Sequence, residues 1–332
     1  MRLYISGYGT VSRALIELLL KNKDRYPLTL QVVGIIGREG LLEDQAGLDL
    51  EKLLQAGSGS SGIRAYAEQE GINLQSAYTF KGDALIEATP TNMNDGDPAY
   101  SYIKQALQDG LDVVTISKGA LVHHFHELSE LTLSKQSVLK YSGAVAAALP
   151  TLDVGQYCLA GSTITGFEAV LNGTSNYILT EMMDDQTYRE ALQQAQNKGI
   201  AESDPSLDVC GVDSANKLVI LANSLFIGAW SYSDVEVVGI ETLKEEEVTT
   251  AKQRNQTIRL VAKAEQLENR LSLSVKPELL EKDHLLSIVK GTNKGIVFRT
   301  EEMGDLFVSG GASSPTGAAA AAIKDLLNIR RK

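Results

Sequence analysis

The stretch MRLYISGYGTVSRALIELL, residues 1–19, decides the fold of the first half of the chain. It begins with the alternating apolar pair Leu3 and Ile5, which predicts a short β-strand. This strand runs directly into a turn at Gly7 and Gly9. Behind the turn, apolar residues recur at helical spacing, at Val11, Ala14, Leu15, Leu18 and Leu19. Strand, glycine turn and helix in this order are the context that a dinucleotide-binding fingerprint requires.

Ser12 departs from that fingerprint, because it stands where a third glycine is expected. The third glycine mainly allows close helix–strand packing, whereas the first two shape the turn and admit the pyrophosphate. Serine is small, so we expect an intact phosphate site at the positive end of a helix that starts near Thr10. The predicted cofactor contacts here are Gly7, Gly9, Thr10 and Val11. The alternative is a glycine turn that holds no ligand.

The pattern continues through the first half of the chain. Further strand-like runs lie at residues 28–37, 84–89, 111–117 and 137–143, and helical segments at 101–110 and 125–134. Strands that alternate with helices predict an α/β fold with a doubly wound, Rossmann-type parallel sheet.

The end of the second predicted strand bears on the choice of cofactor. An acidic residue there would accept a hydrogen bond from a ribose 2′-hydroxyl and repel a 2′-phosphate. This chain has Gly37 and Arg38 instead, and a guanidinium suits a 2′-phosphate. We therefore predict NADP in preference to NAD. The alternative is that Arg38 is simply solvated, or pairs with Glu39.

Composition excludes other classes of protein. A chain of 332 residues with 43% apolar and 22% charged residues suits a two-domain globular protein, and its net charge of −11 disfavours a nucleic-acid partner. No run approaches the roughly 20 apolar residues of a membrane span, and the strand-like start is unlike a signal peptide. Cys158 and Cys210 lack metal-ligand spacing, so we expect reduced thiols in a cytoplasmic protein. His123, His124 and His126 are expected to have surface or packing roles.

The second half of the chain contains the polar residues that are suited to catalysis or substrate binding. Residues 162–173 predict a strand, 188–199 a helix closed by Gly199, and about 211–226 another helix. The loop between these helices is acidic and carries Glu202, Asp204 and Asp208. Asp213 and Lys217 are four residues apart and share a helix face, which is also the pattern of a plain solvated ion pair.

Several motifs, taken together, resemble those of the homoserine dehydrogenases. They are GYGTV (7–11), PTNMNDGDP (90–98), VVTISKGAL (113–121), VAAALP (145–150), NGTSNYILT (172–180), GIAESDPSLDVCGVDSANK (199–217) and KGTNKGIVF (290–298). The resemblance runs almost end to end, and the 199–217 motif is long and specific. It points to the short form, without an aspartokinase or a C-terminal regulatory domain, which disfavours inhibition by threonine.

This resemblance implies the activity and the organisation of the chain. The reaction would be the reversible NAD(P)-dependent interconversion of L-homoserine and L-aspartate 4-semialdehyde, in threonine and methionine biosynthesis. The expected domains are a nucleotide-binding domain over residues 1–140, completed by a C-terminal helix at about 310–332, and an α+β catalytic domain over 141–309. The catalytic domain's sheet would form a homodimer.

The resemblance also assigns residue roles. Lys217 matches the family's proton donor and acceptor, and Lys118 a lysine near nicotinamide and substrate. Asp213 and Glu202 match residues that hold the substrate, largely through its amino group. The remaining expected contacts are Asp208 and Thr174 with substrate, and Thr89, Thr91, Lys118, Gly199 and Gly310–Gly311 with cofactor.

The chemistry agrees with these roles. Carboxylates suit the substrate ammonium, and lysines suit its carboxylate and the alkoxide that develops. Hydride would pass between nicotinamide and the aldehyde carbon while Lys217 handles the proton. There is a tension, because the adjacent Asp213 favours a charged lysine and general-base work requires a neutral one.

Residues 141–150, YSGAVAAALP, depart from the family pattern. Ser142 stands where relatives carry a glutamate that supports a bound sodium or similar cation. The carbonyls of Val145, Ala147 and Leu149 can still converge, but a hard cation loses its one charged ligand. We therefore expect weak or no dependence of activity on sodium or potassium.

Two other functions stay open at this point. Ser12 and Ser142 leave room for a related dehydrogenase that acts on another amino-acid semialdehyde. A catalytically silent NADP-binding sensor is the third reading. The joint presence of Lys118, Glu202, Asp213 and Lys217 argues against the sensor, because a binding module would need no such set.

Overall fold

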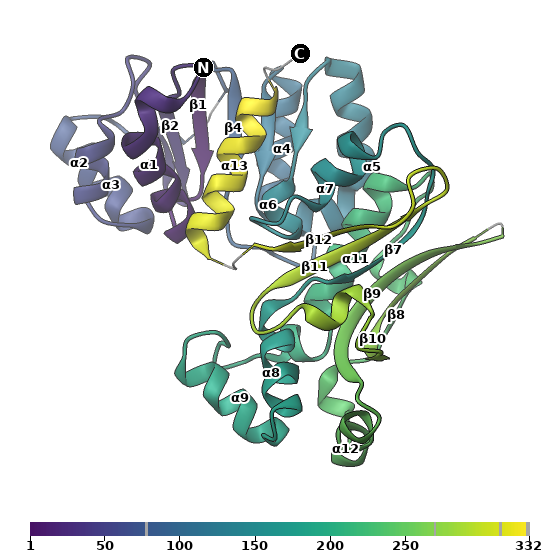
Figure 1. Cartoon of the computed structure of the whole chain (residues 1–332). Helices are drawn as coiled ribbons and strands as arrows, with labels where there is room; N and C mark the ends of the chain where they lie inside the picture. Colours follow the sequence, from purple (N-terminus) through teal and green to yellow (C-terminus); the bar gives the residue numbers. More distant parts are fainter. Residues whose placement is uncertain (77–78, 269, 312–313, 330–332) are drawn as a thin grey trace. The chain divides into compact units, whose positions relative to one another are not determined.

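The computed structural model describes residues 1–76, 79–268, 270–311 and 314–329. The chain divides into two compact units, which are residues 1–144 with the segment from Ser314, and residues 145–313. Each unit holds one six-stranded sheet (Figure 1). No helix in the described part of the chain is both long enough and apolar enough to cross a bilayer.

The sheet of the first unit confirms the predicted α/β class and Rossmann-type arrangement. Its strands, in spatial order, are β3 (Gly40–Glu43), β2 (Gln31–Gly37), β1 (Arg2–Ser6), β4 (Ala84–Glu87), β5 (Asp112–Thr115) and β6 (Leu139–Lys140). All neighbouring pairs are parallel except β2 and β3. The edge strand β3 is antiparallel to β2, because the two-residue turn at Arg38 and Glu39 is long enough only for an antiparallel hairpin.

Helices cover both faces of this sheet. They are α1 (Thr10–Asn22), α2 (Leu50–Gln55), α3 (Gly59–Glu70), α4 (Ala99–Gln108), α5 (Gly119–Lys135) and α13 (Pro315–Ile329). Leu3 and Ile5 of β1 pack into one core with α1 and α13, which lie side by side (Figure 1). Tyr4, between them in sequence, packs into a second core with α4 and α5. This alternation across β1 is the physical basis of the doubly wound arrangement.

The second unit is built on a mostly antiparallel sheet. Its strands, in spatial order, are β12 (Leu306–Gly310), β11 (Lys294–Thr300), β7 (Ile164–Val170), β9 (Thr257–Leu267), β10 (Arg270–Leu280) and β8 (Val235–Val237). Its helices are α7 (Thr151–Asp153), α8 (Gly173–Met183), α9 (Tyr188–Asn197), α10 (Ser206–Val209), α11 (Val212–Leu225) and α12 (Glu245–Gln253). The short helix α6 (Ser142–Val145) spans the boundary between the units. The long, largely buried α11 packs against β8, β9 and β10.

Candidate functional site

The glycine turn after β1 is shaped for close approach. Gly7 has a φ of +82°, and a Cβ built on it would lie 2.8 Å from the carbonyl oxygen of Ala88. Gly9 caps α1, and no described atom lies within 4 Å of a Cβ built on it. None of the described residues in the first turn of α1 is acidic. An open helix start of this kind, with its amides directed outward, accepts an anion such as a pyrophosphate.

Ser12 is small enough for this turn and also stabilises it through a hydrogen bond. Its side chain is buried, and its hydroxyl donates a hydrogen bond to the carbonyl of Gly7 at 2.8 Å. The hydroxyl therefore ties the first turn of α1 to the phosphate turn, which a glycine at this position could not do.

Restoring the third glycine is therefore expected to destabilise the protein. Ser12→Gly removes a hydrogen bond worth about 1 kcal/mol and adds a helix-interior glycine, so the free energy of unfolding in urea should fall by about 1–2 kcal/mol. In Ser12→Ala, which loses only the hydrogen bond, the free energy of unfolding should fall by about half as much. A Ser12→Gly protein as stable as the parent would contradict this account.

Glu87, the last residue of β4, organises the carboxyl edge of the sheet. It is fully buried and accepts hydrogen bonds from the hydroxyls of Thr115 at 2.7 Å and Ser117 at 2.5 Å. It also accepts from the backbone amide and the hydroxyl of Thr89. Sequence reasoning missed Glu87. The available signal was an ionisable residue inside an otherwise buried strand.

The loops that follow β4 and β5 meet at two predicted cofactor residues. The backbone amide of Lys118 donates to the hydroxyl of Thr91 at 3.3 Å. Together with the contact from Thr89 to Glu87, this places Thr89, Thr91 and Lys118 at the carboxyl ends of two adjacent parallel strands. Ligands bind at this edge in open α/β sheets.

Arg38 lies exposed in the turn between β2 and β3. Glu39, the suggested partner of Arg38, pairs with Arg64 instead and accepts a hydrogen bond from its Nε at 2.9 Å. This hydrogen bond lowers the pKa of the Glu39 carboxyl. The acidic neighbour of Arg38 is thus matched by a different cation.

The ion pair on α11 is a buried one. Lys217 Nζ donates to Asp213 Oδ2 at 2.6 Å and to the carbonyl of Leu171 at 2.9 Å. The side chains of Lys217 and Asp213 are 11% and 15% exposed. The alternative of a plain solvated pair was therefore wrong. Leu171, which precedes α8, contacts the lysine on this face of the helix.

Asn172 joins the ion pair to the acidic loop. Its side chain caps α8 by accepting from the amide of Ser175 at 2.9 Å. Its Nδ2 donates to Asp208 Oδ1 at 2.6 Å and to Asp213 Oδ2 at 2.8 Å. The sequence predicted no role for Asn172, which lies in the 172–180 motif. A helix-capping asparagine before Gly173 was the available signal.

Carboxylates outnumber ammonium groups among the hydrogen-bonded residues of this cluster that the structure describes. Asp208 and Asp213 lie there with the ammonium of Lys217. Burial raises the pKa of Asp208, and the nearby charge of Asp213 raises it further, while the hydrogen bond from Asn172 opposes both. A half-buried site with an excess carboxylate favours the binding of a further cationic group.

The other predicted residues of this unit are distributed around the cluster. Thr174 Oγ1 donates to the carbonyl of Ile200 at 3.1 Å, next to Gly199, whose φ of +68° ends α9. Glu202 lies in the following loop with its side chain exposed, and its carbonyl accepts from Gln196 at 3.2 Å. The structure thus brings Asp208, Asp213 and Lys217 together and leaves Glu202 at the surface.

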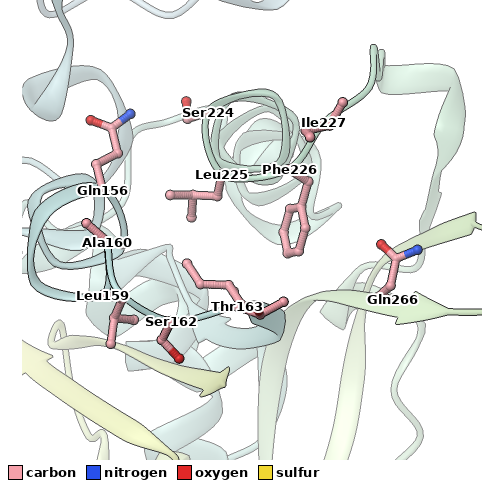
Figure 2. A pocket seen from close by; sticks show the side chains of 12 residues that line it. Gln156, Leu159, Ala160, Ser162, Thr163, Ser224, Leu225, Phe226, Ile227 and Gln266 are labelled. Atoms are coloured by element: carbon pink, nitrogen blue, oxygen red, sulfur yellow. The ribbon is translucent and has the colours of Figure 1, made fainter. Parts of the chain in front are cut away.

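A cavity of about 580 Å³ opens at the other end of α11. Figure 2 shows Leu225 and Phe226 on its wall, with Gln156 and Gln266 at its sides. None of the described residues that line it is ionisable. Leu225 follows Lys217 by eight residues, or about 12 Å along the helix. The cavity lacks the charges for an amino acid, so the Lys217 cluster is the better candidate for the reaction site.

Neither the histidine cluster nor the cysteines form a metal centre. His123 Nε2 contacts the carbonyl of Met93 at 2.8 Å, and His124 Nε2 that of Asp95 at 3.0 Å, which are packing roles. Cys158 and Cys210 are free thiols. Across the described residues, no group of three or more His, Cys, Asp or Glu side chains is arranged to hold a metal ion.

A Rossmann-type nucleotide-binding unit, followed by an α+β unit with a buried lysine–carboxylate cluster, defines an NAD(P)-dependent oxidoreductase. The chain belongs to the homoserine dehydrogenase family. The family's profile, homoserine dehydrogenase, matches residues 150–327, and its NAD-binding-domain profile matches residues 7–141.

Individual relatives resemble the chain over nearly its whole length. An NAD(+)-dependent homoserine dehydrogenase from Pseudomonas canavaninivorans is 34% identical, over 99% of this chain and 96% of the relative. A homoserine dehydrogenase from Methanocaldococcus jannaschii is 33% identical, over 99% and 98%. A hyperthermophilic archaeal homoserine dehydrogenase solved in complex with NADPH is 25% identical and superposes with a TM-score of 0.82, over 99% and 97%.

Proposed function

We propose that the protein interconverts L-homoserine and L-aspartate 4-semialdehyde, with NADP as the preferred cofactor. The observation that carries the proposal is the buried Lys217, held 2.6 Å from Asp213 in a cluster with one carboxylate in excess. Homoserine brings an ammonium for that carboxylate and a hydroxyl for the lysine. The test is reduction of NADP or NAD by L-homoserine, followed by the absorbance of the reduced nicotinamide.

In this mechanism the cluster binds one end of the substrate and handles its proton. Asp208 and Asp213 bind the substrate ammonium, with Thr174 and Glu202 as further contacts. Bound NAD(P) supplies or accepts the hydride at the nicotinamide. Lys217 gives a proton to the oxygen during reduction and receives it during oxidation. Asp213 holds the lysine ammonium in position through their hydrogen bond.

The proposed cofactor contacts follow the carboxyl edge of the first sheet. Gly7, Gly9, Thr10 and Val11 would hold the pyrophosphate at the start of α1, where the open space beside Gly9 fits this group. The remaining proposed contacts are Arg38 with the ribose phosphate, Thr89, Thr91 and Lys118 near the nicotinamide, and Gly199 and Gly311 from the second unit.

The preference for NADP depends on Arg38. It lies exposed after β2, where an acidic residue would favour NAD, and the acid next to it is already paired with Arg64. A guanidinium can donate two hydrogen bonds to a 2′-phosphate.

Arg38→Ala is expected to lower kcat/KM for NADP relative to NAD. The loss of charge-assisted hydrogen bonds, about 1–3 kcal/mol, corresponds to a change of roughly 5- to 150-fold in that ratio. Steady-state kinetics with both cofactors measure it, and Arg25→Ala, at an exposed arginine beyond α1, is the control. Equal KM values for NADP and NAD in the unsubstituted protein would refute the preference.

We also propose that the sheet of the second unit forms a homodimer. Glu168 on β7 is ringed by Lys263, His284 and Arg299, whose side chains are 25%, 29% and 39% exposed. A partly open sheet surface with paired charges of both signs can meet a second copy of itself. Light scattering should give twice the chain mass of 35.8 kDa, and a monomer would refute the proposal.

We place the enzyme in the cytoplasm, in threonine and methionine biosynthesis.

A further inference from the structure

Lys294 is a buried lysine whose ammonium reaches into a turn of the backbone. It is the first residue of β11 and is 3% exposed. Its Nζ donates a hydrogen bond to the carbonyl of Ala146 at 3.1 Å. A charge that is removed from water to this extent requires hydrogen-bonded partners, and a turn of backbone carbonyls can provide them.

The turn that receives this ammonium is closely packed. Val145, Ala146 and Leu149 are almost fully buried, and Ala147 has a φ of +52°. The end of β12 closes over the same turn, because a Cβ built on Gly311 would lie 2.7 Å from the amide nitrogen of Leu149. Val145, Ala147 and Leu149 supply the carbonyls at which the sequence resemblance places a monovalent cation, and Ala146 lies between the first two.

The residue at the position of the cation's charged ligand makes different contacts in this chain. Ser142 replaces the glutamate of the relatives, and its amide and hydroxyl donate to the two carboxylate oxygens of Asp325 at 2.9 and 2.8 Å. Lys324 in turn donates to the Ser142 hydroxyl at 2.8 Å. The polar groups of Ser142 are therefore used in hydrogen bonds to α13. Without a carboxylate at this position, the residues present do not fit a hard cation in the turn.

We propose that the Lys294 ammonium takes the place of the monovalent cation in this turn. It carries the same unit charge, and it donates to the carbonyl of Ala146, which lies between two of the residues whose carbonyls a metal ion would use. Because it is attached to β11, it fixes the turn to the sheet at every salt concentration. A sodium or potassium ion in the same turn would be repelled by the like charge. This inference concerns the fold of the second unit and does not depend on the substrate.

The first arm of the test uses the unsubstituted protein. Its Tm is measured in sodium, potassium, ammonium and choline chloride at equal ionic strength, and no difference between the four salts is expected. A selective rise of Tm in sodium or potassium would show an inorganic cation site and would overturn the proposal, whatever the variants do.

The second arm removes the attached cation. Lys294→Ala leaves space beside the Ala146 carbonyl, so its Tm should fall by about 5 °C or more in choline chloride and recover at least partly in ammonium chloride, whose cation has the same N–H donors. Lys294→Met fills the space without a charge and should show the fall without the recovery. Lys290→Ala, at an exposed lysine of the preceding loop, is the control and should resemble the parent. A folded Lys294→Ala protein whose Tm is the same in all the salts would also overturn the proposal.

Discussion

Lys217→Ala is expected to lower the turnover of homoserine by about 10²–10⁴-fold, the loss typical of a positioned acid or base. Affinity for NADP should stay nearly unchanged, because its proposed contacts lie mainly in the first unit. Lys217 is buried, is held by Asp213 and the carbonyl of Leu171, and so presents its ammonium in one geometry. Single-turnover kinetics measure the chemical step, and fluorescence titration measures cofactor affinity.

Lys118→Ala is the control for this assignment, since Lys118 is the other lysine proposed to act near the reacting carbonyl. It should weaken cofactor or substrate binding more than proton transfer. Near-normal turnover in Lys217→Ala, with turnover abolished in Lys118→Ala, would move the acid–base role to Lys118. Tm is measured in parallel, because Lys217→Ala leaves Asp213 without the ammonium that it faces.

Asp213→Asn is expected to raise KM for homoserine by about 10- to 150-fold and to lower kcat as well. The KM effect follows from the loss of a charge-assisted hydrogen bond to the substrate ammonium, worth about 1.5–3 kcal/mol. The kcat effect follows because Asp213 also holds Lys217, at 2.6 Å. An increase of KM with kcat unchanged would show that Asp213 binds the substrate without positioning the lysine.

Asp208→Asn is the matched control, because Asp208 contacts Asn172 while the ion pair on α11 is made by Asp213. It should raise KM and largely retain kcat. Burial raises the pKa of Asp208, so its ionised form is less stable in the folded chain than in the unfolded one. The variant should therefore match or exceed the parent in stability above the folded pKa, and this advantage should vanish as the pH falls below the unfolded pKa.

Local patterns explain what the sequence could predict. The alternation around Leu3 and Ile5, followed by a helical repeat, defines β1, the turn and α1 within one continuous stretch. In the second unit, the four-residue spacing of Asp213 and Lys217 correctly predicted that the two side chains meet. Both inferences need only the geometry of a single element.

Contacts between distant segments explain what the sequence could not predict. Glu87 is paired with Thr115, 28 residues away, and Asn172 with Asp208, 36 residues away. Lys294 and Ala146 are separated by 148 residues. No local repeat encodes such pairs, because the fold alone brings them together. The burial of Lys217 likewise depends on the carbonyl of Leu171, 46 residues earlier.

The most direct measurement compares L-homoserine with 4-hydroxybutyrate, which lacks the ammonium, as reductants of NADP and NAD. The account predicts reduction of both cofactors by L-homoserine, more efficiently for NADP. It predicts a kcat/KM for 4-hydroxybutyrate that is lower by about 10- to 150-fold, the effect of losing a charged hydrogen bond. Cofactor binding without reduction by L-homoserine, or equal kcat/KM values for the two alcohols, would contradict it.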